Sequence, residues 1–222
     1  YSTGGIQDVL VIGNYAYLVG YDGLYVLDVR NPANPTRVGR LRTAKMADIA
    51  MVGNYLYGTD IYALGYGLRV VDVSNPAQPR QVGFIQMPGP AGVAVRGNYV
   101  VVADAVAGTL VMDVSTPSAP VQVGSYPVSG ATDHVASVGT LVYLTDDNGL
   151  LRVVDVSNPA APRQVGYYPL VKQVVHYPLV KGGGGMAAVG NYVFVASGEA
   201  GLYTLRYTRG GPFISGQVTT AA

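Results

Sequence analysis

The sequence contains no cysteine among its 222 residues. Disulfide bonds and thiol catalysis are therefore excluded, and the lack of cysteine is compatible with a cytosolic as well as an extracellular protein. A chain of this length buries roughly two thirds to three quarters of its unfolded surface, and 49% of its residues are hydrophobic. We therefore expect a single domain whose core needs neither a disulfide nor a metal.

Charge is also scarce, because charged residues make up 12% of the chain and the net charge is +1. Without a basic stripe, nucleic acid is not an expected partner. The most apolar stretch, from Tyr99 to Met112, is interrupted by Asp104 and Gly108. It is shorter than the roughly 20 residues that a membrane helix needs, so we expect no membrane insertion by this chain.

Three short markers recur in a fixed order along the chain. The first is Gly-Asn-Tyr, which begins at Gly13, Gly53, Gly97 and Gly190, with a variant at Gly139. The second is an Asp followed by a turn with two prolines, at residues 28–35, 72–79, 113–120 and 155–162, which degenerates at residues 206–212. The third is Val-Gly, at Val38, Val82, Val123 and Val165, which fades to Ser215-Gly216. The chain therefore consists of five copies of one repeat.

A period of about 42 residues with four short apolar runs is the size of one propeller blade. In the first copy these runs are residues 9–12, 15–19, 24–29 and 36–41, rich in the Val, Leu and Tyr that strands favour. We therefore predict an all-β protein, a β-propeller with five blades of four antiparallel strands. The predicted blades are residues 5–43, 44–87, 88–128, 129–181 and 182–220. Five copies suggest a five-bladed ring, and part of a larger ring is the alternative.

The turns have a physical basis in the repeat. Gly-Asn suits a two-residue hairpin that needs a positive φ. The Asp of the second marker is expected to cap its proline-containing turn through the backbone, as aspartate does in Asx-turns. This predicts a structural role for Asp28, Asp72, Asp113 and Asp155.

These markers resemble the LVIVD-repeat family, above all in the string from Gly67 to Pro79, which recurs around Leu151 to Pro162. The resemblance implies a propeller from bacterial or archaeal cell-surface or secreted proteins. It carries no catalytic motif and implies no activity. A start at Tyr1, without Met or a signal-like segment, is expected of a processed mature form or a piece of a longer protein. We therefore expect an extracellular or cell-surface location.

In a four-stranded blade the first and third hairpins lie on one face, which we call the marker face because it carries the repeat markers. The second hairpins and the links between blades lie on the opposite face, the loop face. Its segments differ from copy to copy, and function often resides in such variable loops on a rigid scaffold. They are residues 21–22, 59–66, 104–107, 146–148 and 197–200.

The fourth interblade link contains a tandem duplication, in which residues 168–172 return as residues 177–181. A tolerated insertion in a surface loop is one explanation, because loop length costs little closure entropy. The other is an apolar contact loop for a protein partner or for self-association. Its candidate partner-binding residues are Tyr168, Leu170, Lys172, His176, Tyr177, Leu179 and Lys181.

Five residues before each signature Gly lie Asp8, Asp48, Gly92, His134 and Gly185, which should ring the mouth of the central channel. Asp8, Asp48 and His134 are candidates for a shared cation or sugar, with solvated polar residues as the simpler interpretation. Residues 146–149 lack the spacing of a calcium loop and are interpreted as a hairpin turn. We expect no metal and no cofactor.

No nucleophile-elbow motif is present, and the two histidines are His134 and His176. We therefore expect a non-enzymatic interaction or structural module that binds a protein partner or self-assembles through the loop face. One alternative is a lectin-like glycan-binding propeller, although there is no Trp to stack on a sugar. The other is a hydrolase with its site at the central channel.

Overall fold

In a computed structural model, the structure describes residues 5–61, 65–170, 185–197, 201–208 and 214–219. They form five separate sheets, each of four antiparallel strands in chain order. The strands are β1 (Ile6–Ile12), β2 (Tyr15–Gly20), β3 (Gly23–Asp28), β4 (Thr36–Leu41), β5 (Met46–Val52), β6 (Tyr55–Asp60), β7 (Gly67–Asp72), β8 (Arg80–Gln86), β9 (Pro90–Arg96), β10 (Tyr99–Asp104), β11 (Gly108–Asp113), β12 (Val121–Tyr126), β13 (Thr132–Val138), β14 (Leu141–Asp146), β15 (Leu150–Asp155), β16 (Arg163–Pro169), β17 (Met186–Val189), β18 (Tyr192–Ser197), β19 (Gly201–Tyr207) and β20 (Ile214–Thr219). The predicted five-bladed, four-stranded architecture is confirmed.

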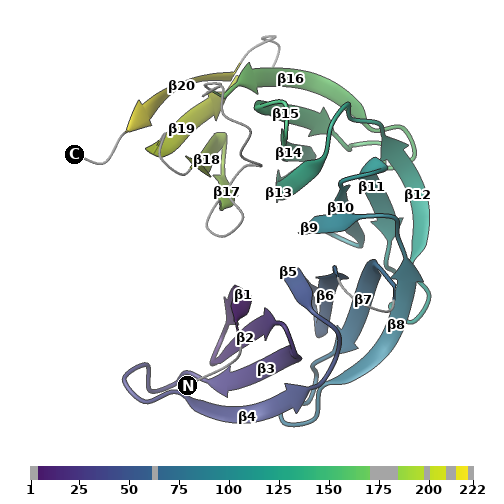
Figure 1. Ribbon diagram of the computed structural model, residues 1–222, viewed down its shortest axis with the longest axis vertical. Helices are drawn as coiled ribbons and strands as arrows, with labels where there is room; N and C mark the ends of the chain where they lie inside the picture. Colours follow the sequence, from purple (N-terminus) through teal and green to yellow (C-terminus); the bar gives the residue numbers. More distant parts are fainter. Residues whose placement is uncertain (1–4, 62–64, 171–184, 198–200, 209–213, 220–222) are drawn as a thin grey trace.

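We number the sheets blade 1 (β1–β4), blade 2 (β5–β8), blade 3 (β9–β12), blade 4 (β13–β16) and blade 5 (β17–β20). The first strand of each blade lies nearest the axis and the fourth lies on the outside (Figure 1). The degenerate fifth copy still pairs β19 with β20 from Leu202–Thr219 to Tyr207–Ile214. None of the described residues forms a helix long and apolar enough to cross a membrane.

The signature glycines occupy the hairpin between the first two strands of every blade. Their φ angles are positive, from 53° at Gly97 to 59° at Gly190, and residues with a Cβ rarely adopt this backbone conformation. In blade 1 the strands pair up to Ile12 and Tyr15, so the turn consists of two residues. The predicted two-residue hairpin is confirmed.

The aspartates of the second marker cap their own turns. A carboxylate oxygen accepts a hydrogen bond from the backbone N–H two residues on, at 2.8–3.0 Å. These bonds join Asp28 to Arg30, Asp72 to Ser74, Asp113 to Ser115 and Asp155 to Ser157. This arrangement is the Asx-turn expected from the sequence, and the structural role of these aspartates is confirmed.

The Val-Gly marker has a role that the sequence alone did not reveal. A Cβ added at Gly83 of β8 would lie 2.6 Å from the carbonyl oxygen of Pro117, which belongs to the turn of the next blade. Gly39 faces Pro76 and Gly124 faces Pro159 in the same way. The glycine therefore lets the proline turn of one blade lie directly on the outer strand of the blade before it.

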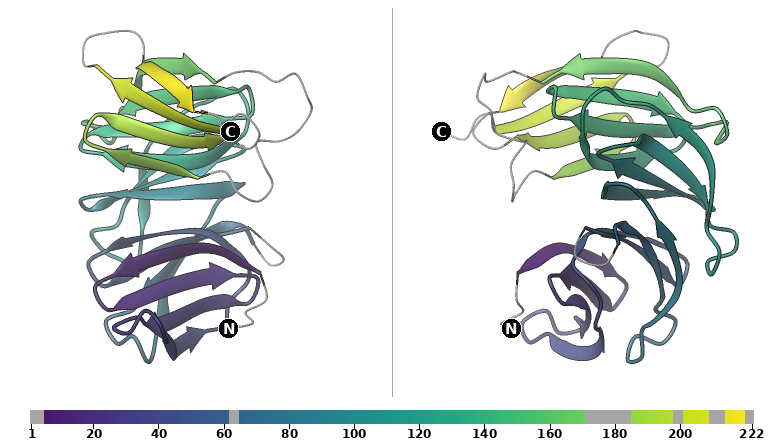
Figure 2. Two further views of the ribbon diagram at one scale, coloured as in Figure 1. Left: turned by 90° about the vertical axis from the view of Figure 1, so that its left-hand side faces the viewer. Right: turned by 45° about the vertical axis from the view of Figure 1, so that its right-hand side comes forward.

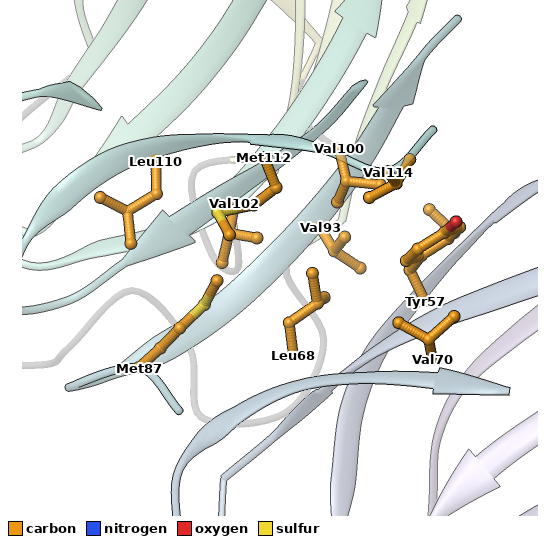
Figure 3. Close-up of a cluster of buried hydrophobic side chains, with 11 residues drawn as sticks. Tyr57, Leu68, Val70, Met87, Val93, Val100, Val102, Leu110, Met112 and Val114 are labelled. Atoms are coloured by element: carbon orange, nitrogen blue, oxygen red, sulfur yellow. The ribbon is translucent and has the colours of Figure 1, made fainter. Parts of the chain in front are cut away.

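The hydrophobic core is divided among the junctions between blades. Figure 3 shows Leu68 of blade 2 directed at Val93 of blade 3, in one buried cluster that also includes Val70 of blade 2 and Met112 of blade 3. Similar clusters fill the other three junctions. At each of these four junctions, the forward face of one blade packs on the backward face of the next blade.

The five blades follow an arc that stays open between blade 1 and blade 5 (Figures 1 and 2). Contacts join β1 to β5, β5 to β9, β9 to β13 and β13 to β17. Among the described residues, no comparable contact joins blade 5 to blade 1. The described parts of the five blades therefore do not close a ring by themselves.

Candidate functional site

The inner strand of each of the first four blades contains a β-bulge at the same place. The pairing register shifts between Ile6 and Asp8, within β5, within β9, and between Thr132 and His134. The residue after the bulge is opposite Val19 in blade 1 and Thr145 in blade 4, which are equivalent positions of the second strands. The bulge therefore sets Asp8, Asp48, Gly92 and His134 in structurally equivalent places, as the spacing predicted.

Asp8 and Asp48 are engaged in contacts between blades. Asp8 Oδ2 accepts a hydrogen bond from the Ile49 N–H of blade 2 at 3.0 Å. Asp48 Oδ2 accepts one from the Val93 N–H of blade 3 at 2.7 Å. The two aspartates thus link three successive inner strands, a role that the sequence analysis missed because it requires the geometry between blades.

The carboxyl groups of Asp8 and Asp48 also interact with each other. Asp48 Oδ1 accepts from the same Ile49 N–H as Asp8 does, at 2.9 Å. Burial, with a further contribution from the Asp8 carboxylate, raises the pKa of Asp48 well above its usual range. Hydrogen bonds from Val93 and Ile49 oppose this rise. Asp48 therefore keeps its proton to a higher pH than an ordinary carboxyl group does.

Gly92 ends this series of side-chain bridges. A Cβ at Gly92 would lie 2.9 Å from the Asp133 carbonyl oxygen and 3.1 Å from the Val135 nitrogen. The backbones of the inner strands β9 and β13 therefore lie so close together at Gly92 that there is no room for a side chain. Blade 3 lies between Asp48 and His134, and at the equivalent position it has Gly92, which contributes no polar side chain.

His134 and its neighbour Asp133 are both half-buried. Desolvation lowers the pKa of His134, and the Asp133 charge opposes that change. Desolvation likewise raises the pKa of Asp133, against the opposing effect of His134. Within the described part of the chain, no group of three or more His, Cys, Asp or Glu side chains could hold a metal ion. Asp8, Asp48 and His134 therefore do not form one ligand set.

The segment at residues 146–149 is a hairpin turn, as expected. Asp146 Oδ1 accepts hydrogen bonds from the Asn148 and Leu150 N–H groups at 3.1 and 3.0 Å. Its other oxygen pairs with Arg152 at 2.7 Å. The carboxylate is fully buried and holds the turn in place.

The duplicated link is only partly described. Tyr168 packs against the cluster between blades 4 and 5, and Leu170 is buried in it. Leu170 corrects the expectation of an exposed contact residue, because its N–H donates to the Gly149 carbonyl oxygen at 2.8 Å and fixes it in blade 4. The other candidate residues lie outside the described residues, namely Lys172, His176, Tyr177, Leu179 and Lys181.

Exposed apolar side chains occupy successive second hairpins on the loop face. Tyr21 of blade 1 is 59% exposed, Tyr66 of blade 2 is 50% exposed and Val106 of blade 3 is 73% exposed. The ammonium group of Lys45, in the link that follows blade 1, lies 4.3 Å from the centre of the Tyr21 ring. Each of these blades thus presents one apolar side chain on the same face, a tyrosine in blades 1 and 2 and a valine in blade 3.

The polar group next to the apolar tip of blade 3 is already paired within the scaffold. Asp104 precedes Val106 and accepts hydrogen bonds from the Val106 and Ala107 N–H groups at 2.9 and 2.8 Å. Its second oxygen accepts from the Gly89 N–H at 2.9 Å. The turn is therefore held rigidly and offers its apolar tip to solvent.

Comparison with known protein families finds one model that matches this chain repeatedly. The model is described as the LVIVD repeat, and it matches residues 3–43, 45–86, 90–128, 129–169 and 184–205. The last match ends before the degenerate turn of blade 5. No curated protein matches the chain in sequence.

Several solved structures are similar in fold. A functionally unknown protein from Desulfotomaculum acetoxidans has a TM-score of 0.79 and 10% identity, over 98% of this chain and 70% of that one. A protein from Lactobacillus plantarum has a TM-score of 0.76 and 16% identity, over 93% of this chain and 67% of that one. The periplasmic gluconolactonase PpgL of Pseudomonas aeruginosa has a TM-score of 0.74 and 14% identity, over 91% and 68%. These identities show the fold alone. The unmatched part is about a third of each longer chain, which corresponds to roughly two more blades of about 42 residues.

Proposed function

This chain belongs to the LVIVD-repeat family, and on that premise we propose that it is a non-enzymatic module of the cell surface or extracellular space that binds a protein partner through its loop face. The observation that supports this most is the row of exposed apolar tips at Tyr21, Tyr66 and Val106. Tyrosine and other large apolar side chains on a rigid base are typical anchors of protein interfaces. The proposed location follows from the family resemblance.

The polar groups nearest the channel favour binding over catalysis. In Asp8 and Asp48, one carboxylate oxygen accepts from the backbone of the next blade and the other from the backbone of its own strand. A general base or a ligand for a sugar needs a free oxygen within reach of its substrate. Because these carboxylates serve the scaffold, we take the exposed apolar side chains of the loop face as the contact surface for a partner.

The proposal is tested by a variant that removes the apolar tips together, Tyr21→Ser, Tyr66→Ser and Val106→Ser. A matched control is Val121→Ser, which removes an equally exposed side chain from the outer strand β12. A partner would be isolated from surface material of the producing organism, identified, purified and titrated against both variants. We expect the triple variant to bind at least about 10-fold more weakly and the control to bind like the parent.

Equal binding by the triple variant and the parent would contradict the proposal. Glycan binding that is lost on changing Asp48 or His134 would instead favour the lectin alternative. Turnover of lactone or ester substrates that is lost with His134→Ala would favour the hydrolase. Circular dichroism of each variant separates loss of binding from loss of fold.

A further inference from the structure

The backward face of blade 1 has the composition of a blade junction but is uncovered. Val9 of β1 is 54% exposed, whereas its equivalents in blades 2, 3 and 4 are 4–8% exposed. Those equivalents, which lie four residues before the signature Gly, are Ile49, Val93 and Val135. Each of the three is buried in the core cluster that joins its blade to the previous one. Val11, two residues along β1, is also exposed.

The forward face of blade 5 shows the same contrast. Leu202 of β19 is 42% exposed, while the side chains at the equivalent position of every other blade are 0% exposed. Those side chains are Leu24, Leu68, Thr109 and Leu151. Leu24, Leu68 and Leu151 pack against the next blade. Leu202 is directed at a blade that these five do not supply.

The proline turn of blade 1 supports this interpretation independently. In blades 2 and 3 the turn lies on a glycine of the preceding outer strand, through Pro76 on Gly39 and Pro117 on Gly83. The turn of blade 1 has the same sequence pattern, but Pro32 is exposed where Pro76 and Pro117 are partly covered. The turn is therefore formed without the outer strand on which it would lie.

We propose that these two faces are docking surfaces for further blades of the same repeat, carried in cis on one polypeptide and completing the ring. At all four existing junctions the covering sheet is the neighbouring blade of the same chain, and the exposed positions are the ones that those junctions bury. The longer matched chains have room for roughly two more blades of about 42 residues. A second copy would add five blades, more than the roughly two blades of additional chain in those structures. This inference does not depend on the proposed binding partner.

The test appends a copy of residues 44–128, which contains blades 2 and 3, to the C-terminus of the full chain. Hydrogen exchange should then slow in β1 and β19 alone, and the melting temperature should rise. Val9→Glu tests whether the backward face of blade 1 is covered. We expect it to change the melting temperature by less than about 2 °C in the 222-residue chain and to lower it by more than about 5 °C in the extended chain. Ile49→Glu, at the covered equivalent position, should lower the melting temperature of both chains strongly.

Unchanged exchange of β1 and β19 in the extended chain would overturn the proposal, including when the appended part does not fold. A second measurement needs only the 222-residue chain. Light scattering should find it monomeric, and Val9→Glu and Leu202→Glu should leave its melting temperature within about 2 °C. A dimer that either substitution dissociates would show that a second copy covers the faces. If Val9→Glu or Leu202→Glu lowered the melting temperature of the 222-residue chain as much as Ile49→Glu does, the faces would already be covered and the proposal would be wrong.

Discussion

Aspartate has two structural roles in this chain, and its pKa moves in opposite directions in the two. At the proline turns, hydrogen bonds from the Ser74 side chain and N–H, with Arg80, lower the pKa of Asp72 to about 2. Between the inner strands, burial and the Asp8 carboxylate raise the pKa of Asp48. The first role therefore favours the charged form and the second the protonated form.

Asp48→Asn should change the pH dependence of stability. A carboxyl group with a raised pKa in the folded protein contributes full stability below its unfolded pKa of about 4 and loses it as the pH rises toward the folded value. Asparagine keeps an oxygen to accept from Val93 and carries no charge. We expect the variant to melt at a higher temperature than the parent at pH 8 and to lose this advantage at pH 4. A difference that does not vary with pH would contradict the assignment.

Asp72→Ala should show the opposite dependence. Because the pKa of Asp72 is lowered to about 2, its stabilisation is present above the unfolded value of about 4 and is lost as the pH falls toward 2. Removing the turn cap should cost about 1 kcal/mol at pH 7, measured by urea unfolding. Asp72→Asn retains the acceptor for Ser74 and serves as the control. Equal losses in the two variants would indicate that the pairing with Arg80, and not the turn cap, is what matters.

At the scale of elements, the outer strand and the next proline turn form one repeated contact. Gly39→Ala should be destabilising by about 1–3 kcal/mol, since the new Cβ would overlap the Pro76 carbonyl oxygen. Gly166→Ala is the matched control, because its Cβ would lie 3.5 Å from the nearest atom, in the Tyr207 ring of the degenerate fifth copy. Thermal unfolding of both variants measures the difference. Similar losses would contradict this role of the glycine.

Elements were easier to predict than contacts between them. The Gly-Asn hairpins and the Asp-capped turns follow from local chemistry within a few residues, so the repeat markers predict them. The links from Asp8 to Ile49 and from Asp48 to Val93 join residues about 40 positions apart and depend on how blades stack. Leu170 was misassigned for the same reason, because it is buried in a cluster that blades 4 and 5 form together. The burial of a residue in a propeller is decided by the neighbouring blade.

At the scale of the whole molecule, repetition allows each junction to serve as the reference for the others. The positions of Val9 and Leu202 are exposed at the two ends of the arc, whereas their equivalents at the formed junctions are buried, apart from the partly buried Met186. The sequence predicted five blades but did not decide whether they close a ring. Every copy has apolar residues at the junction positions, whether or not a neighbouring blade covers them. The open arc is thus a property that only the assembled structure reveals.

The open arc is tested most directly by cross-linking, because the chain has no cysteine of its own. Val9→Cys with Leu202→Cys would be treated with a short bis-maleimide, beside a control pair across a formed junction, Val38→Cys with Ala77→Cys. Leu24 and Ile49, the equivalents of Leu202 and Val9, share one buried cluster, so a closed ring would bring the test pair together. We predict intramolecular cross-linking of the control pair and none of the test pair. Cross-linking of both pairs to the same extent would contradict the open arc.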